Sequence, residues 1–136
     1  MDFLVNLDVD DLERGVDFYS SLFGLQVGRR LGGFAVELLG GPAPIYLLHK
    51  DAGSAATPEG NQHRHYGRHW TPVHLDFVVE DIESATAKAI ALGARLEKPI
   101  TTENWGRLAL LADPFGHGFC LIQFSAAGYD SLPQGA

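Results

Sequence analysis

The feature that most restricts the fold of this sequence is an internal repeat. The segment 4–13 can be laid over the segment 74–83 at an offset of 70 residues. Each copy begins with an alternating, strand-like stretch, continues through acidic residues that can cap a helix, and leads into a one-sided apolar stripe of helical period. Because self-similarity at a fixed offset indicates repeated structural units, we expect two copies of one supersecondary unit.

Both copies predict the same order of elements. Each predicted helix starts at an aspartate, Asp10 or Asp11 in the first copy and Asp81 in the second, and ends at a glycine, Gly24 or Gly93. Three strand-like segments separated by turn residues follow each helix. They are 25–30, 34–39 and 45–50 in the first copy, and 94–98, 107–112 and 118–124 in the second. The chain therefore reads as an α+β fold with the order strand–helix–strand–strand–strand, twice.

The length of 136 residues and the 46% of hydrophobic residues suit one domain of ordinary size. Within this domain we expect a first module at 3–50, a linker at 51–69, a second module at 70–124 and a polar tail at 125–136. The linker is rich in small, polar and histidine residues. A structureless loop of this length is uncommon in a compact domain, so we expect the linker to make contacts of its own.

Charge and cysteine content exclude several classes of partner. Ten lysines and arginines against seventeen aspartates and glutamates give a net charge of −7, which repels nucleic acid and anionic membranes. No apolar run approaches the roughly 18 residues needed to span a membrane, and acidic residues from Asp2 onward leave no signal-peptide pattern. Cys120 is the only cysteine, which excludes an internal disulfide and a thiolate cluster. We expect a cytoplasmic protein.

Two motifs frame the repeats. The first runs from Val9 to Leu25 as V-x-D-L-E-x-x-V-x-F-Y-x-x-L-F-G-L, and the second is D-P-F-G-H, from Asp113 to His117, just before the last predicted strand. With the tandem βαβββ order, these motifs resemble the vicinal oxygen chelate superfamily of glyoxalase I, bleomycin-resistance proteins and extradiol dioxygenases. The resemblance covers residues 3–124. It implies curled mixed sheets that form cups, and a homodimer that completes them.

The same resemblance implies four positions for metal ligands, on the first and last strands of each half. In this sequence they are occupied by Leu4, Tyr46, His74 and Cys120. Only His74 matches the usual histidine, whereas a catalytic zinc site takes three protein ligands and other transition metals make similar demands. We therefore expect no metal and no other cofactor at these positions.

Strand alternation gives an independent view of the same region. Neighbouring residues on a strand point to opposite faces, so His74 and Asp76 lie opposite the apolar face of their strand, as Asn6 and Asp8 do on the first strand. The apolar faces are expected under the helices, which leaves the polar side chains on the concave side. There they form a small-molecule site or hydrogen-bond to one another within a structural sheet.

Other residues near this concave side are candidates for ligand contact. Tyr46 and Cys120 are expected to share the hollow with His74, and Trp105 beside Arg107 offers a floor for a planar or anionic ligand. The alternatives are cavity filling by Tyr46, cover of a sheet edge by Trp105, and a buried, inert thiol at Cys120. The predicted ligand-binding set is Asn6, Tyr46, His74, Asp76, Trp105, Arg107 and Cys120.

The linker holds three further histidines, His63, His65 and His69, in a short run with an exposed character. These side chains can gather a divalent metal if the loop folds back, although no carboxylate lies among them. A solvated loop or a lid over the neighbouring cup is the favoured interpretation.

Two functions follow from these residues. The first is a metal-independent protein, similar to bleomycin-resistance proteins, that binds a small organic ligand in a cup-shaped cavity. The alternative is a metal-dependent glyoxalase-like lyase, isomerase or dioxygenase whose replacement ligands are His74 with Asp76, or the linker histidines. The number of available metal ligands favours the first function, and the sequence leaves open whether any reaction is catalysed.

Overall fold

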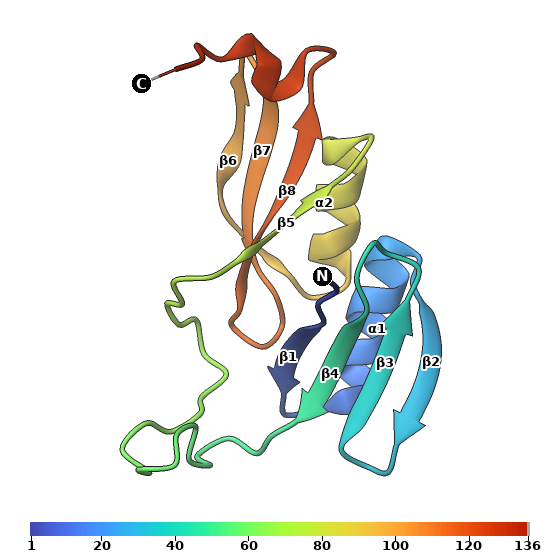
Figure 1. Cartoon of the computed structure of the whole chain (residues 1–136), viewed down its shortest axis with the longest axis vertical. Helices are drawn as coiled ribbons and strands as arrows, with labels where there is room; N and C mark the ends of the chain where they lie inside the picture. The colour runs from blue at the N-terminus through green and yellow to red at the C-terminus, as the bar shows by residue number, and fades with distance from the viewer. Residues whose placement is uncertain (136) are drawn as a thin grey trace. The chain divides into compact units, whose positions relative to one another are not determined.

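The computed structural model describes residues 1–135. The chain divides into two compact units, Met1–Gly67 and Arg68–Ala136. Each unit contains one sheet and one helix that lies across one face of it (Figure 1). The two repeats predicted from the sequence are therefore two structural units with the same order of elements.

The first unit contains β1 (Val5–Val9), α1 (Leu12–Phe23), β2 (Gln26–Leu31), β3 (Ala35–Leu39) and β4 (Ile45–His49). Its sheet has the strand order β1-β4-β3-β2. The pair β1–β4 is parallel, and the other two pairs are antiparallel.

The second unit contains β5 (Leu75–Val78), α2 (Ile82–Ala91), β6 (Arg95–Glu103), β7 (Gly106–Ala112) and β8 (Gly118–Phe124), followed by the short 3₁₀ helix η1 (Gly128–Ser131). Its sheet has the order β5-β8-β7-β6, with β5–β8 parallel and the remaining pairs antiparallel. Two βαβββ modules with mixed sheets confirm the predicted α+β fold.

Both predicted helix starts and the end of α1 at Gly24 are confirmed, whereas α2 ends at Ala91 with Leu92 as its C-cap, ahead of the predicted Gly93. Asp11 caps α1 by accepting a 3.1 Å hydrogen bond from the Arg14 amide, and Asp81 caps α2 in the same way through Ser84. Gly24 ends α1 in the left-handed region at φ 65°. Each cap satisfies a backbone donor that a helix start leaves without a partner.

The strand β6 is longer than the sequence pattern predicted. The pattern ended this strand at residue 98, before Pro99, whereas β6 continues to Glu103. Proline cannot donate a ladder hydrogen bond and is confined to edge strands or bulges. Here β6 is the edge strand, and its register to β7 shifts on both sides of Lys98, so the proline is tolerated.

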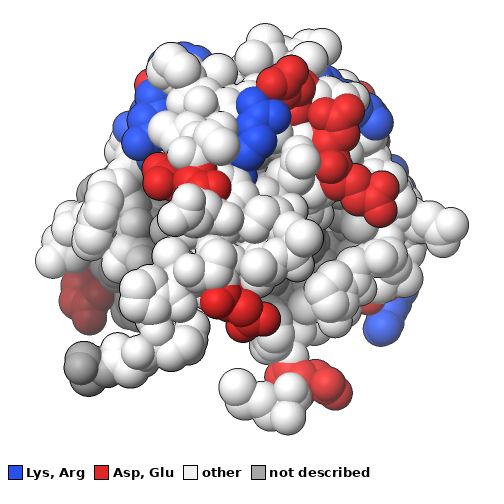
Figure 2. Space-filling view, turned by 90° about the horizontal axis from the view of Figure 1, so that it is seen from above, with Lys and Arg blue, Asp and Glu red and all other residues white. Residues whose placement is uncertain are grey.

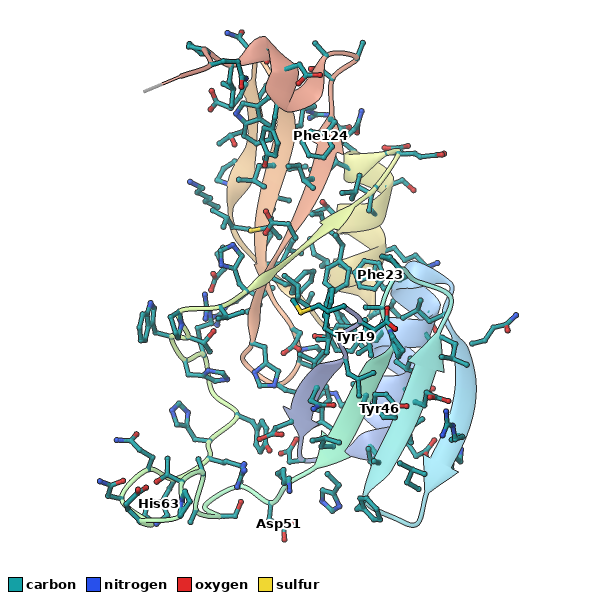
Figure 3. The ribbon with its side chains drawn as sticks, viewed as in Figure 1. Tyr19, Phe23, Tyr46, Asp51, His63 and Phe124 are labelled. Atoms are coloured by element: carbon teal, nitrogen blue, oxygen red, sulfur yellow. The ribbon has the colours of Figure 1, made fainter. Side chains whose placement is uncertain are left out.

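The linker makes the contacts that its length predicted. Arg64 Nε donates to Asp8 Oδ2 at 2.8 Å, and the Tyr66 hydroxyl donates to the Lys50 carbonyl at 2.6 Å. Burial, with the charges of nearby aspartates, raises the pKa of Tyr66 to about 12. The loop between these contacts carries His63, which forms an isolated bridge with Ala55 (Figure 3).

Acidic side chains recur over the face shown in Figure 2, in keeping with the net charge of −7. Within residues 1–135, neither α1 nor α2 has the length and apolar character needed to cross a membrane.

Candidate ligand-binding site

In each unit, one row of side chains crosses the sheet face that the helix leaves open. Residues that pair directly on neighbouring strands point to the same face. In the second unit Asp76 pairs with Cys120, and Cys120 pairs with Leu110. In the first unit Asn6 pairs with Tyr46, and Tyr46 with Glu37. The two rows occupy corresponding places in the repeat and differ in chemistry.

The second row brings together three of the predicted site residues. Ligand atoms of His74, Asp76 and Cys120 lie within 4.8 Å of one another. His74 Nε2 is 3.3 Å from Asp76 Oδ1. Burial, followed by the charge and hydrogen bond of Asp76, raises the pKa of the Cys120 thiol to about 12. The thiol is therefore protonated at neutral pH and is not a nucleophile in this state.

A pocket of about 220 Å³ lies beside this cluster, entirely within the second unit. It is lined by Arg68, Trp70, Thr71, His74, Glu97, Leu110, Leu111, Gly118, Phe119 and Cys120. His74 and Cys120 were predicted, but Arg68, Trp70 and Glu97 were not. Their sequence surroundings resemble an ordinary linker and an edge strand, and only the tertiary structure places them together.

One wall of the pocket is built by an ion pair. Arg68 donates to both carboxylate oxygens of Glu97, from Nε at 2.7 Å and from Nη2 at 3.1 Å, and its Nη1 donates to the His69 carbonyl. The hydrogen bonds from Arg68 lower the pKa of Glu97, and the same pairing raises the pKa of Arg68. Gly118 makes room for this guanidinium, since a Cβ there would lie 2.6 Å from Arg68 Nη2.

The backbone carrying this wall is held by the D-P-F-G-H turn. The Asp113 carboxylate accepts hydrogen bonds from the amides of Phe115, at 2.8 Å, and His117, at 3.0 Å. The same turn also holds His69. The His69 amide donates to the Gly116 carbonyl, and its Nε2 lies 2.8 Å from Nδ1 of His117. The closing motif therefore anchors the segment 68–70 that forms the pocket wall.

The first row is a closed polar network. Glu37 is only 4% exposed, and its carboxylate accepts from the Tyr46 hydroxyl and from the backbone and Nε of Arg29 at 3.1 and 3.3 Å. The hydrogen bond between the Tyr46 hydroxyl and the Glu37 carboxylate lowers the pKa of Glu37 and raises the pKa of Tyr46. Gly28 leaves the necessary space, because a Cβ there would lie 2.5 Å from Glu37 Oε1. Figure 3 shows Tyr46 on this sheet.

Sequence reasoning did not identify Glu37. Its neighbours Val36 and Leu38 are apolar and buried, so the residue looks like one polar position of an alternating strand. A charged residue is rarely fully buried unless it is paired, and the pairing depends on a bulge in β2 that the sequence does not reveal. Asn6, a predicted site residue, lies exposed on β1 beside Tyr46.

The structure does not place Trp105 and Arg107 in the pocket. Trp105 lies in the turn between β6 and β7, with its ring centroid 5.5 Å from that of Tyr129. Arg107 Nη2 lies 2.8 Å from Glu83 Oε1 on α2. Arg107 therefore points to the helix side of the sheet, opposite Cys120, because odd and even positions of β7 face opposite ways.

The linker histidines belong to different units. His63 lies in the loop of the first unit, where it forms a bridge with Ala55, whereas His69 contacts the D-P-F-G-H turn of the second. Within residues 1–135, the group of side chains found close enough to share an ion consists of His74, Asp76 and Cys120.

Comparison with known sequences identifies the family of this chain. The profile of a glyoxalase-like domain matches residues 4–122. The chain belongs to the glyoxalase-like domain family. An uncharacterised protein of Mycobacterium bovis is 29% identical over 133 residues, which cover 87% of this chain and 80% of the relative. The anthracycline biosynthesis protein DauV of Streptomyces sp. (strain C5) is 30% identical over 97% of this chain, which spans only 44% of DauV.

Solved structures show the same fold. A glyoxalase/bleomycin resistance protein/dioxygenase family enzyme from Burkholderia phytofirmans superposes with a TM-score of 0.69, at 20% identity, over 90% of this chain and 97% of that protein. A mutant of the fosfomycin resistance protein FosX from Listeria monocytogenes, complexed with Mn(II) and 1S,2S-dihydroxypropylphosphonic acid, superposes with a TM-score of 0.68 at 21% identity. The match covers 93% of this chain and 91% of that protein. This glyoxalase-like chain therefore has the vicinal oxygen chelate fold.

Members of this fold can hold a metal ion, so we compared the side-chain donor atoms available in each unit. The two units differ in the number of these atoms. In the first unit Leu4 has no donor atom, and the Tyr46 hydroxyl is engaged by Glu37. In the second unit the cluster offers nitrogen, oxygen and sulfur from three residues, which is the number of protein ligands in a catalytic zinc site. The four family positions do not fit a metal together, whereas the cluster of His74, Asp76 and Cys120 in the second unit does.

Proposed function

We propose that this glyoxalase-like protein binds a small organic ligand in the pocket of the second unit, without a catalytic metal. The observation that carries the proposal is the pocket of about 220 Å³ that adjoins the polar cluster of His74, Asp76 and Cys120. A cavity with a partly apolar lining and a few convergent polar groups is the usual form of a small-molecule site. In this scheme the polar cluster orients the ligand, and the Leu110 side of the pocket contacts its apolar part.

One observation supports binding without a metal. At the family positions of the first unit, the Leu4 side chain has no donor atom, and the Tyr46 hydroxyl already donates to Glu37.

The relatives suggest where to look for the ligand. DauV is named for anthracycline biosynthesis, and FosX for fosfomycin resistance. We propose that the ligand of this chain belongs to the same broad class of antibiotics and metabolites, held within a protein of the cytoplasm.

A thermal-shift screen tests this function. The metal-stripped protein is melted with a panel of metabolites and antibiotics, and a ligand at 100 times its Kd is expected to raise the Tm by several degrees through mass action. The shift should be lost in His74→Ala and retained in Glu103→Gln, an exposed carboxylate at the far end of β6. Equal shifts in both variants would place the binding outside the pocket and contradict the proposal.

The cluster itself favours a second candidate, a metal-dependent lyase, isomerase or dioxygenase. His74, Asp76 and Cys120 would hold the ion, which supplies Lewis-acid chemistry when bound. Purified protein that retains a stoichiometric metal, lost in Cys120→Ser and Asp76→Asn, would establish this candidate and displace the first.

We also propose a homodimer. Apolar side chains on β5 and just before it are exposed in the second unit, with Val73 at 76% and Val78 at 66%. Exposed apolar side chains that lie close together mark interaction sites. Sedimentation velocity should give the mass of two chains, and a Val78→Asp variant should shift the protein towards the mass of one.

A further inference from the structure

Two histidines join the pocket wall to the turn that carries it. His69 Nε2 lies 2.8 Å from His117 Nδ1, and the two rings are steeply inclined, with their centroids 4.8 Å apart. The two residues are 48 positions apart in the sequence, so the contact depends on the fold of the second unit. Both are half-buried, and neither is among the residues that line the pocket. The pair therefore has no part in the ligand contacts proposed above.

The backbone is held firmly on one side of this contact and lightly on the other. The His117 amide donates to the Asp113 carboxylate at 3.0 Å, and the His117 carbonyl accepts from the Asp113 amide at 2.9 Å. The His69 amide makes a longer hydrogen bond, of 3.3 Å, to the Gly116 carbonyl. The segment 68–70 depends in addition on side-chain contacts, of which the histidine pair is one. Loss of this contact would loosen the pocket wall and leave the turn in place.

A hydrogen bond between two imidazole rings survives the addition of one proton but not of two. In the neutral pair one of the facing nitrogens carries the hydrogen and the other accepts it. A first added proton leaves a donor facing a lone pair, and the bond becomes charge-assisted. A second added proton leaves two N–H groups facing each other, without an acceptor and with two like charges in contact. Because histidine is the side chain that ordinarily changes charge between pH 5 and 8, mild acid is the condition that breaks such a bond.

The charged side chains around the pair do not offset this added charge. Arg68 Nε donates to Glu97 of β6 at 2.7 Å, and Arg95 of the same strand lies 3.8 Å from that carboxylate. The pKa of Arg68 is raised by the hydrogen bond to Glu97 and, to a smaller extent, by the charge of Asp113 in the turn. These groups are two cations and two anions. Two imidazolium charges beside them would therefore leave an excess of positive charge at the contact.

We propose that the pair of His69 and His117 is an acid-sensitive fastening of the pocket wall, which opens when both rings are protonated. The segment 68–70 then loses its side-chain contact with the D-P-F-G-H turn, and the pocket wall becomes mobile. The docked wall is stable while the pair holds no more than one added proton, and it is released as the pH falls and the second proton binds. A ligand held by this wall would leave the pocket in mild acid; that consequence rests on the proposed function, whereas the release itself does not.

Amide hydrogen exchange at pH 7.5 and pH 5, measured by NMR on the full chain and corrected for the intrinsic pH dependence of exchange, tests the release. The protection of the His69 amide should fall about tenfold or more at pH 5, the effect typical of losing one hydrogen bond to a charged group. The Gly116 amide, which donates to the Asp113 carbonyl at 3.1 Å, should keep its protection because the turn remains folded. Imidazole nitrogen spectra of the same samples should show two protonation steps shared by the pair.

Variants separate this pair from the other histidines. His117→Asn keeps a hydrogen-bonding group near the place of Nδ1 and takes up no proton, so the protection of the His69 amide should no longer depend on pH. His69→Gln tests the same contact from the other side, and His117→Ala should lower the protection at both pH values. The matched control is His49→Asn, an exposed histidine of the first unit, which should respond like the wild type. His74→Gln, which removes the titratable imidazole of the pocket, should also keep the wild-type response. Melting curves show whether each variant is folded.

Three results would overturn the proposal. The first is equal protection of the His69 amide at the two pH values, and the second is an acid response that persists in His117→Asn. The third is an equal loss of protection at Gly116, which would show that the whole turn unfolds. Failure of the proposed function is distinguishable from these results. A ligand screen without a pocket-dependent ligand removes that function and leaves the release intact, whereas a failed exchange test leaves the function standing.

Discussion

The two units share one topology and use it in opposite ways. The first unit buries a carboxylate, Glu37, and satisfies it with Tyr46 and Arg29. The second unit keeps a carboxylate, Asp76, at the edge of a pocket without a permanent cation beside it. A buried and fully paired charge specifies the packing of a sheet, whereas the Asp76 carboxylate, paired with a histidine, stays partly exposed.

The difference arises from the side chains of the two rows, together with the irregular register of β2 that brings Arg29 to Glu37. Corresponding strands pair in the same order and directions, so Tyr46 and Cys120 occupy equivalent places in their sheets. Next to Tyr46 stands Glu37, and next to Cys120 stands Leu110. The rows differ at all three paired positions, which hold Asn6, Tyr46 and Glu37 in the first unit and Asp76, Cys120 and Leu110 in the second. Four predictions test this contrast between the units.

The largest effect is expected for Glu37→Ala. The change leaves the Tyr46 hydroxyl and the Arg29 amide without their acceptor, and unsatisfied polar groups in a nearly buried position destabilise a fold strongly. We expect the Tm to fall by roughly 10 °C, with pocket affinity unchanged in the folded protein. Glu103→Ala, an exposed carboxylate, is the control and should shift the Tm by little. Equal decreases in Tm for the two variants would contradict a structural role of Glu37.

The next effect distinguishes the two close-approach glycines. In Gly28→Ala the new Cβ meets the held carboxylate of Glu37, whereas in Gly118→Ala it meets the end of the long Arg68 side chain, which can move. We expect Gly28→Ala to lower the Tm by roughly 5 °C and Gly118→Ala by under about 2 °C. Gly118→Ala should instead alter ligand affinity by displacing Arg68. The reverse order of melting temperatures would contradict the contrast.

A smaller effect is expected on the pH dependence of the Tm, through the network of Glu37, Tyr46 and Arg29. Because the folded pKa of Glu37 lies below its unfolded value, its contribution is present above the ordinary glutamate pKa of about 4.3 and is lost as pH falls through the folded pKa. The Tm difference between the wild type and Glu37→Ala should therefore shrink as pH is lowered from about 6 to about 3. Melting curves across this range check it; a constant difference would show that the carboxylate charge is irrelevant.

The smallest effect is expected on the helix side of the second sheet. Arg107→Gln breaks an ion pair with Glu83 that is largely exposed, and such pairs contribute about 1 kcal/mol or less. Ligand affinity should be unchanged because Arg107 faces α2. Arg68→Gln, the matched change within the pocket, should alter affinity measurably. A loss of ligand binding in Arg107→Gln would show that this residue belongs to the binding site.

The sequence predicted much of the fold because its signals are local. Capping aspartates, terminal glycines and the periodicity of apolar residues act within a few neighbouring positions, so Asp11, Gly24 and Asp81 were identified correctly. The end of β6 was wrong because the tolerance of Pro99 depends on its being on an edge strand, which is a property of the assembled sheet.

The candidate site divides in the same way. Alternation along single strands predicted that His74 and Asp76 share a face, and the register of the parallel pair then placed Cys120 beside them. Alternation did not reveal which face of β7 turns to the helix; Arg107, one of the predicted site residues, pairs with Glu83 of α2 and does not line the pocket. The direction of a face is decided by packing.

By itself, then, the amino-acid sequence determined the duplicated βαβββ order, the helix boundaries and the polar character of the open sheet faces, since each depends on residues close together in the chain. The tertiary structure alone decided that Arg68 and Trp70 wall a pocket and that Glu37 is closed in by Tyr46 and Arg29. These relations join residues of different strands and loops, and their free energy depends on distances and burial that exist only once the sheets have formed.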